Sequence, residues 1–145
     1  MKVLRKSLAG LLSVLLLSPF NPIQANAENS EKLILELNKI EASENSCLLT
    51  FLVTSSLSKD LEKLAYEFVV FDNDMKVNRM TVFDFQDLNA SKIRVRQFQL
   101  ADTPCETLGR LLINDTSACK SGGVDSKMCS DKLEISNKTQ LEFLN

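Results

Sequence analysis

The chain has 145 residues, of which 17 are basic, 19 are acidic and none is histidine, so its formal net charge at pH 7 is −2. Without histidine, the sequence excludes Ser-His-Asp and Cys-His catalytic sets and lacks the side chain that most often transfers protons near neutral pH. The length suits one domain with its own hydrophobic core, and we expect that this domain is not an enzyme.

The N-terminal segment has the three parts of a secretory signal peptide. Residues 1–6 carry three positive charges, residues 7–20 carry none and are mostly apolar, and the small residues Ala25 and Ala27 follow two prolines. This order is typical of a cleaved leader, and the apolar run is shorter than the roughly 20 residues of a membrane-spanning helix. We therefore predict a signal peptide over residues 1–27, cleaved after Ala27. It would direct the protein through the general secretory route to the periplasm, with no membrane span in the mature protein.

The mature part, residues 28–145, is predicted to be one acidic domain. Removal of residues 1–27 takes away three basic residues and no acidic one. An acidic surface does not attract the phosphates of nucleic acids or the headgroups of anionic lipids, so we expect no nucleic-acid partner.

Alternation of apolar and polar residues predicts β-strands along the mature chain. Leu33, Leu35 and Leu37, for example, share one parity and belong on one face of a strand. Strands are expected over 32–41, 47–56, 63–72, 77–86, 91–100, 107–114 and 131–144. About seven short strands at this spacing, separated by turn residues, indicate an all-β fold, which we interpret as an immunoglobulin-like antiparallel β-sandwich.

Four segments have a less regular pattern. Residues 57–65 also fit one helical turn with leucines on one face, and the polar residues 115–132 are expected to form a disulfide-tied loop. Within 91–100 the apolar parity shifts in the second half, which predicts a bulge. Residues 72–74 fit a hairpin turn better than a calcium loop, because the glycine and glutamate of an EF-hand loop are missing.

The four cysteines, Cys47, Cys105, Cys119 and Cys129, all lie in the mature part. An even number in an oxidising compartment indicates disulfides. A metal site would need C-x-x-C pairs or histidines, so we expect no metal and no cofactor. Of the three possible pairings we favour Cys47–Cys105 and Cys119–Cys129. The second pair flanks a flexible turn over residues 120–123, and strands of alternating direction bring Cys47 and Cys105 to the same end of the sandwich.

Three basic residues, Lys92, Arg94 and Arg96, share one parity in the fifth predicted strand. Basic side chains that alternate along a strand could form a face that binds an acidic partner. The alternative is that they only line the solvated side of a sandwich strand, where exposed charge is usual.

Two resemblances support the fold and the location. Residues 49–56, followed by residues 61–71 and the turn at Asp72, resemble FxLYD-type immunoglobulin-like domains. The mature chain as a whole is similar to small exported proteins of alphaproteobacteria, through residues 47–51, 70–72, 94–98 and 112–114 and the last three cysteines. The resemblance implies a β-sandwich in the periplasm. It implies no activity and assigns no functional residue.

The leading hypothesis for function is a non-enzymatic periplasmic module that binds another envelope protein, because the edges of a sandwich can accept an added strand. The alternative is a small secreted inhibitor of a hydrolase, such as a lysozyme or a protease. Loops tied by disulfides near Cys105 and over residues 119–129 would then present a rigid inhibitory edge at a low ordering cost.

Overall fold

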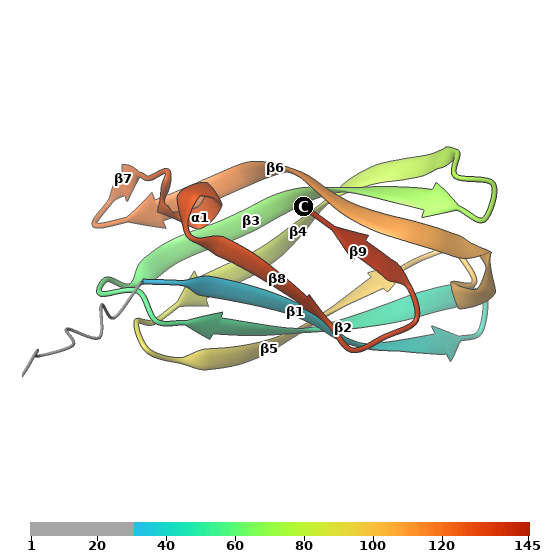
Figure 1. The fold of residues 1–145 in the computed structure, drawn as a ribbon, viewed down its shortest axis with the longest axis horizontal. Coiled ribbons are helices and arrows are strands. Elements are labelled where there is room, and N and C mark those ends of the chain that lie inside the picture. The colour runs from blue at the N-terminus through green and yellow to red at the C-terminus, as the bar shows by residue number, and fades with distance from the viewer. Residues whose placement is uncertain (1–30) are drawn as a thin grey trace, which may run out of the picture.

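Two β-sheets packed face to face make up the protein in a computed structural model that describes residues 31–145 (Figure 1). The predicted signal peptide, residues 1–27, lies outside the described residues. The strands are β1 (Leu33–Ser43), β2 (Ser46–Ser55), β3 (Leu61–Asp72), β4 (Val77–Leu88), β5 (Ile93–Leu100), β6 (Leu108–Ser121), β7 (Val124–Asp125), β8 (Leu133–Asn137) and β9 (Glu142–Leu144). A 3-10 turn, η1, spans Cys105–Thr107, and one short helix, α1, spans Met128–Asp131.

The strands divide between the sheets in the manner of an immunoglobulin-like sandwich. One sheet has the order β5-β2-β1-β8, and the other has the order β4-β3-β6-β7, with β9 also paired to β6. Most neighbours are antiparallel, whereas β8 runs parallel to β1 and β9 parallel to β6. The predicted all-β sandwich is therefore confirmed, with two parallel pairs that the sequence pattern did not indicate.

The C-terminal segment differs most from the prediction. The single strand expected over residues 131–144 is two strands, and the chain moves from one sheet to the other between them. The polar residues between β8 and β9 form this crossing. The Asn137 side chain accepts a hydrogen bond from the Thr139 backbone at 2.9 Å and donates one to the Leu141 carbonyl at 2.6 Å. Local side-chain bonds of this kind end a strand and start a turn.

Two further segments correct the expected boundaries. β6 continues to Ser121 because it stays paired with β3 along its length, so part of the loop expected over residues 115–132 is strand. The stretch 57–65 contains no helix. Leu57, Leu61 and Leu64 do share the core, as their spacing indicated, but a bend followed by the irregular start of β3 brings them there.

Aromatic rings fill the space between the sheets. Phe51, from the centre of β2, is buried, and its ring centroid lies 5.6–6.0 Å from those of five other phenylalanines. Phe83 of β4 and Phe98 of β5 stack at 4.3 Å with an interplanar angle of 8°. This contact joins the two sheets on the side where β4 and β5 are the terminal strands.

Both predicted disulfides are present. Cys47–Cys105 joins β2 to η1 and closes 58 residues, whereas Cys119–Cys129 joins β6 to α1 and closes 10. By the chain-entropy model, loops of these lengths correspond to about 4 and about 3 kcal/mol of stabilisation. The hydroxyl of Tyr66 donates a hydrogen bond to the Cys129 carbonyl at 2.7 Å, which ties the second disulfide to the core. Burial raises the pKa of this hydroxyl, so it stays protonated.

Candidate functional site

The side of the sandwich that carries β4 and β5 brings the predicted basic residues together. These two consecutive strands belong to different sheets, and the chain passes between them through the turn at residues 89–92. The Ala90 backbone donates a hydrogen bond to the Asp60 carboxylate in this turn. Each strand is the last of its sheet, so this side presents two strand edges and their side chains at once.

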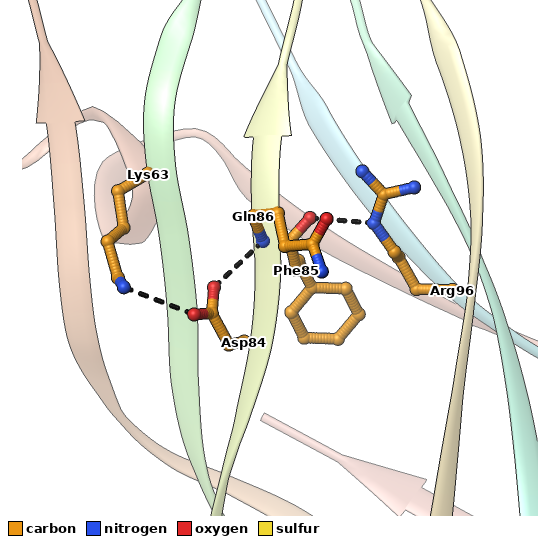
Figure 2. Close-up of polar contacts among 5 residues, drawn as sticks. All are labelled: Lys63, Asp84, Phe85, Gln86 and Arg96. Carbon is orange, nitrogen blue, oxygen red and sulfur yellow. Dashed lines mark hydrogen bonds and ion pairs between the residues drawn. The ribbon is translucent and has the colours of Figure 1, made fainter.

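Arg96 bridges the two sheets on this side, as Figure 2 shows. Its Nε donates a hydrogen bond to the Phe85 carbonyl of β4 at 2.9 Å, and one Nη donates to the Asp87 carbonyl at 3.4 Å. Arg94 donates to the side-chain oxygen of Asn89 at 3.0 Å. The arginines therefore hold the end of β4 against β5 through neutral acceptors.

The part of β4 that receives Arg96 is irregular. Gln86 has a φ of 64°, and the register between β3 and β4 shifts beside it, which marks a bulge. Asp84 holds this bulge by accepting hydrogen bonds from the Gln86 backbone at 2.9 Å and from the Lys63 side chain at 3.1 Å (Figure 2). The hydrogen bond from the Gln86 backbone is the main cause that holds the pKa of Asp84 below its ordinary value. Desolvation opposes it, and the hydrogen bond and charge of Lys63 and the charge of Arg96 add smaller lowering effects.

The orientation of β5 corrects the sequence-based interpretation. β5 pairs with β2 without a register shift, so the bulge predicted within residues 91–100 is absent. Arg94 and Arg96 lie on the inner side of the strand with Phe98, and they are half-buried, whereas Ile93 and Val95 are 59 % and 57 % exposed. Near the open side of a sandwich, a long arginine side chain can cover the interior while its charged head reaches the edge.

The third predicted residue, Lys92, lies in the turn just before β5. Its side chain is exposed, and its carbonyl accepts a hydrogen bond from the Ser55 backbone at 2.9 Å. The structure therefore brings Lys92, Arg94 and Arg96 to one edge, although only Lys92 is well exposed.

The backbone of β5 is available along this edge. In the described part of the chain, β2 is the only strand paired with β5. The Lys92 carbonyl faces β2. Along an antiparallel strand, the backbone N–H and C=O groups of successive residues point alternately toward one neighbouring strand and away from it. The backbone groups of every second β5 residue therefore face away from β2. These residues are Ile93, Val95, Gln97 and Gln99. The Val95 carbonyl accepts a 3.3 Å hydrogen bond from Arg96, which agrees with this direction.

Of the two long edges on this side, β5 is the better template for another strand. β4 is interrupted by register shifts near both ends, and Arg96 occupies the Phe85 and Asp87 carbonyls. Bulges disrupt strand addition. Arg96 bonds to carbonyls on both edges, so the register shifts are what set β4 apart from β5. β5 is regular over all eight residues. The first half of its outer row is apolar, where Ile93 and Val95 lie beside the half-buried Leu52 of β2, and Gln97 and Gln99 continue the row.

A second candidate surface, the β6–β7 hairpin, projects from one end of the sandwich (left in Figure 1). Gly122 and Gly123 form its tip with φ values of 63° and 75°, which a tight two-residue turn requires. The Gly123 backbone donates to the Glu62 carboxylate at 3.0 Å, and the Cys119–Cys129 disulfide fixes its base. Val124, next to the tip, is 64 % exposed. The sequence showed the glycines and cysteines here but not the strand pairing that makes the hairpin rigid.

Other candidate chemistry is not assembled in residues 31–145. No group of three or more histidine, cysteine, aspartate or glutamate side chains in this range could hold a metal ion. Asp72 instead accepts hydrogen bonds from the backbones of Asp74 and Lys76, both at 2.9 Å, as the predicted hairpin turn requires. Within the same range, no helix has the length and apolar character that a membrane crossing needs.

Comparison with known proteins supports the fold. Neither a protein-family model nor a curated protein matches the sequence. A solved structure of IrmA from Escherichia coli superposes with a TM-score of 0.59 at 10 % sequence identity, covering 77 % of this chain and 96 % of that chain. At this identity the likeness extends to the β-sandwich fold alone.

Proposed function

We propose that this chain is a non-enzymatic periplasmic module that binds an extended segment of another envelope protein along the edge of β5. The observation that carries the proposal is the regular edge of β5, which pairs with no second strand within residues 31–145 and turns the backbone groups of Ile93, Val95, Gln97 and Gln99 outward; of these groups, the Val95 carbonyl accepts a hydrogen bond from Arg96. Backbone hydrogen bonds along such an edge supply affinity, and the alternating side chains supply specificity. The exposed Ile93 and Val95 would be covered in the complex.

The periplasmic location is supported by the signal-peptide pattern and by the state of the cysteines. All four cysteines are in disulfides, which persist in oxidising compartments outside the cytoplasm. Two measurements test this part. The exported protein should begin at Glu28, and reduction should add the mass of four hydrogens. Free thiols in the protein isolated from cells, or an uncleaved N-terminus, would contradict the proposed location.

The strand-addition step is tested by capture from envelope extract with variants of the edge. Val95→Pro removes an outward N–H group, and proline is tolerated at an edge position that does not donate to the ladder. Val95→Lys puts a charge into the apolar outer row, and Val82→Lys is its matched control, because Val82 of β4 is 50 % exposed on the neighbouring edge strand.

We expect both Val95 variants to lose the protein that the wild type captures, and Val82→Lys to retain it. Thermal unfolding of each variant checks that the fold is kept. Equal capture by all folded variants would refute β5 as the binding edge.

A hydrolase inhibitor is the second candidate function, and the preorganised β6–β7 hairpin favours it. The tip is narrow, and the disulfide and the Glu62 contact hold it in place before any partner binds, so little conformational entropy would be lost in a cleft. Inhibition assays against lysozymes and proteases test this candidate, with Val124→Asp as the variant that should lose inhibition. Uninhibited activity across the panel would remove it.

A further inference from the structure

Within residues 31–145, the basic side chains along β5 form no close ion pair with a carboxylate. Five other basic residues, Lys32, Lys39, Lys63, Lys76 and Arg110, form ion pairs with carboxylates. Within residues 31–145, no carboxylate forms such a pair with Lys92, Arg94 or Arg96. The acceptors of the two arginines are neutral carbonyl and amide oxygens. An acidic protein thus carries a row of basic side chains without carboxylate ion pairs on its most regular edge, although the charge of Arg96 also acts on Asp84 of β4.

A strand added to β5 would face two different rows of side chains. Residues directly opposite each other in a ladder lie on the same face of the sheet. Partner residues on the outer face would therefore contact Ile93 and Val95, whereas those on the inner face would lie beside Arg94 and Arg96. Over residues 92–96 the edge favours a partner whose residues alternate between two chemical types. Beyond this stretch the outer row continues with Gln97 and Gln99, and the inner row with Phe98 and Leu100.

Resting on the proposed strand addition at β5, we propose that the partner is an extended protein segment in which acidic residues alternate with apolar ones. The acidic residues pair with Lys92, Arg94 and Arg96, and the apolar residues cover Ile93, Val95 and Leu52. Opposite charges placed directly across a ladder stabilise it, and like charges destabilise it.

The same charges disfavour a second copy of this chain as the occupant. If two β5 strands paired antiparallel in a register centred on Arg94, Val95 or Arg96, an arginine of one copy would face an arginine of the other. These residues would occupy the closely spaced positions that are not hydrogen-bonded to the partner, where side chains approach most closely. The arrangement thus disfavours these registers of self-association while leaving the edge open to an acidic strand.

Synthetic peptides of the length of β5 test the proposal on the purified protein. The first alternates glutamate with valine, the second replaces each glutamate with lysine, and the third has the composition of the first without the alternation. Fluorescence anisotropy measures affinity, and amide hydrogen exchange at Ile93, Val95 and Gln97 reports the place of binding. We expect only the alternating glutamate peptide to bind and to slow exchange at these amides.

Charge variants give the expected size of the effect. Lys92→Gln combined with Arg94→Gln should lower the affinity for the glutamate peptide by about tenfold, because exposed ion pairs contribute a modest binding energy. High salt should lower the affinity similarly, because it screens these pairs. Arg96 is left intact because it bridges the sheets. Lys59→Gln combined with Lys138→Gln, two exposed lysines outside β5, is the matched control and should leave the affinity unchanged.

The remaining outcomes separate this inference from the function on which it rests. Equal binding of the glutamate and lysine peptides at β5 would overturn the acidic partner and leave strand addition standing. If no peptide binds but Val95→Pro still abolishes capture from envelope extract, the acidic partner is likewise overturned and strand addition still stands. Failure of all peptides together with unchanged capture by Val95→Pro would overturn both. A dimer formed through β5 would overturn the argument from like charges.

Discussion

Replacement of Arg96 by alanine should weaken the fold by opening the side between β4 and β5. The substitution removes the 2.9 Å hydrogen bond to the Phe85 carbonyl and the longer one to the Asp87 carbonyl. A hydrogen bond from a charged donor contributes about 1.5–3 kcal/mol. Since Arg96 is half-buried and its second bond is long, we expect a loss of about 1–2 kcal/mol in the free energy of unfolding.

Urea denaturation followed by circular dichroism measures this loss as a shift of the midpoint at an unchanged slope. Arg94→Ala is the matched control. It removes one bond to an exposed asparagine side chain and should cost about 0.5 kcal/mol or less. Because the three carbonyl acceptors of Arg96 are neutral, added salt should not abolish the difference between the variants. If Arg96→Ala lowers the free energy of unfolding no more than Arg94→Ala does, the bridge between the sheets is not a stabilising contact.

Three further substitutions test individual contacts. Tyr66→Phe leaves the carbonyl of the buried Cys129 without its 2.7 Å partner and should lower the unfolding free energy by about 1–2 kcal/mol; an unchanged urea midpoint would contradict this. Gly109→Ala would place a Cβ 2.1 Å from the Asp72 carbonyl oxygen, so thermal unfolding should show a loss of about 1–3 kcal/mol, and wild-type stability would show that no close approach exists. The pKa of Asp84 is lower in the folded than in the unfolded chain, so its stabilisation is full above the unfolded pKa and disappears as pH falls through the folded one. Asp84→Asn should therefore lose less stability on acidification than the wild type, and equal losses would refute that reasoning.

Much of the sandwich could be predicted because local pattern and tertiary structure agree. Leu33, Leu35 and Leu37 alternate in sequence and are all buried. The pairing of Cys47 with Cys105 could be predicted because strands of alternating direction bring both cysteines to the same end of the sandwich. In these cases one face of a strand is apolar and buried, and a residue's parity is enough to place it.

The orientation of β5 could not be predicted, because parity separates two rows without saying which row faces inward. Ile93 and Val95 appeared to be the inner row on hydrophobicity alone, but Arg94 and Arg96 occupy it. The reason lies outside the strand, since the β4 carbonyls that accept from Arg96 come from the opposite sheet. The basic residues singled out in the sequence do lie at one edge, but the two arginines face inward, and the exposed side chains beside them, Ile93 and Val95, are apolar.

The C-terminal segment shows a second limit. Residues 131–144 have one parity across a polar middle, which a single long strand would also show. The hydrogen bonds of the Asn137 side chain turn the chain there and divide the segment into β8 and β9. β8 pairs with β1 and β9 pairs with β6 of the other sheet, so the division depends on strands that are distant in sequence. The FxLYD resemblance, the signal peptide and its cleavage after Ala27 stay predictions.

Amide hydrogen exchange of the protein bound to its captured envelope partner tests strand addition most directly. In the free protein, the outward amides of Ile93, Val95, Gln97 and Gln99 should exchange quickly, while the β5 amides that bond to β2 are already slow. The account predicts that the partner slows these four outward amides. Unchanged exchange at all four, with slowing elsewhere such as the tip at Gly123, would contradict it.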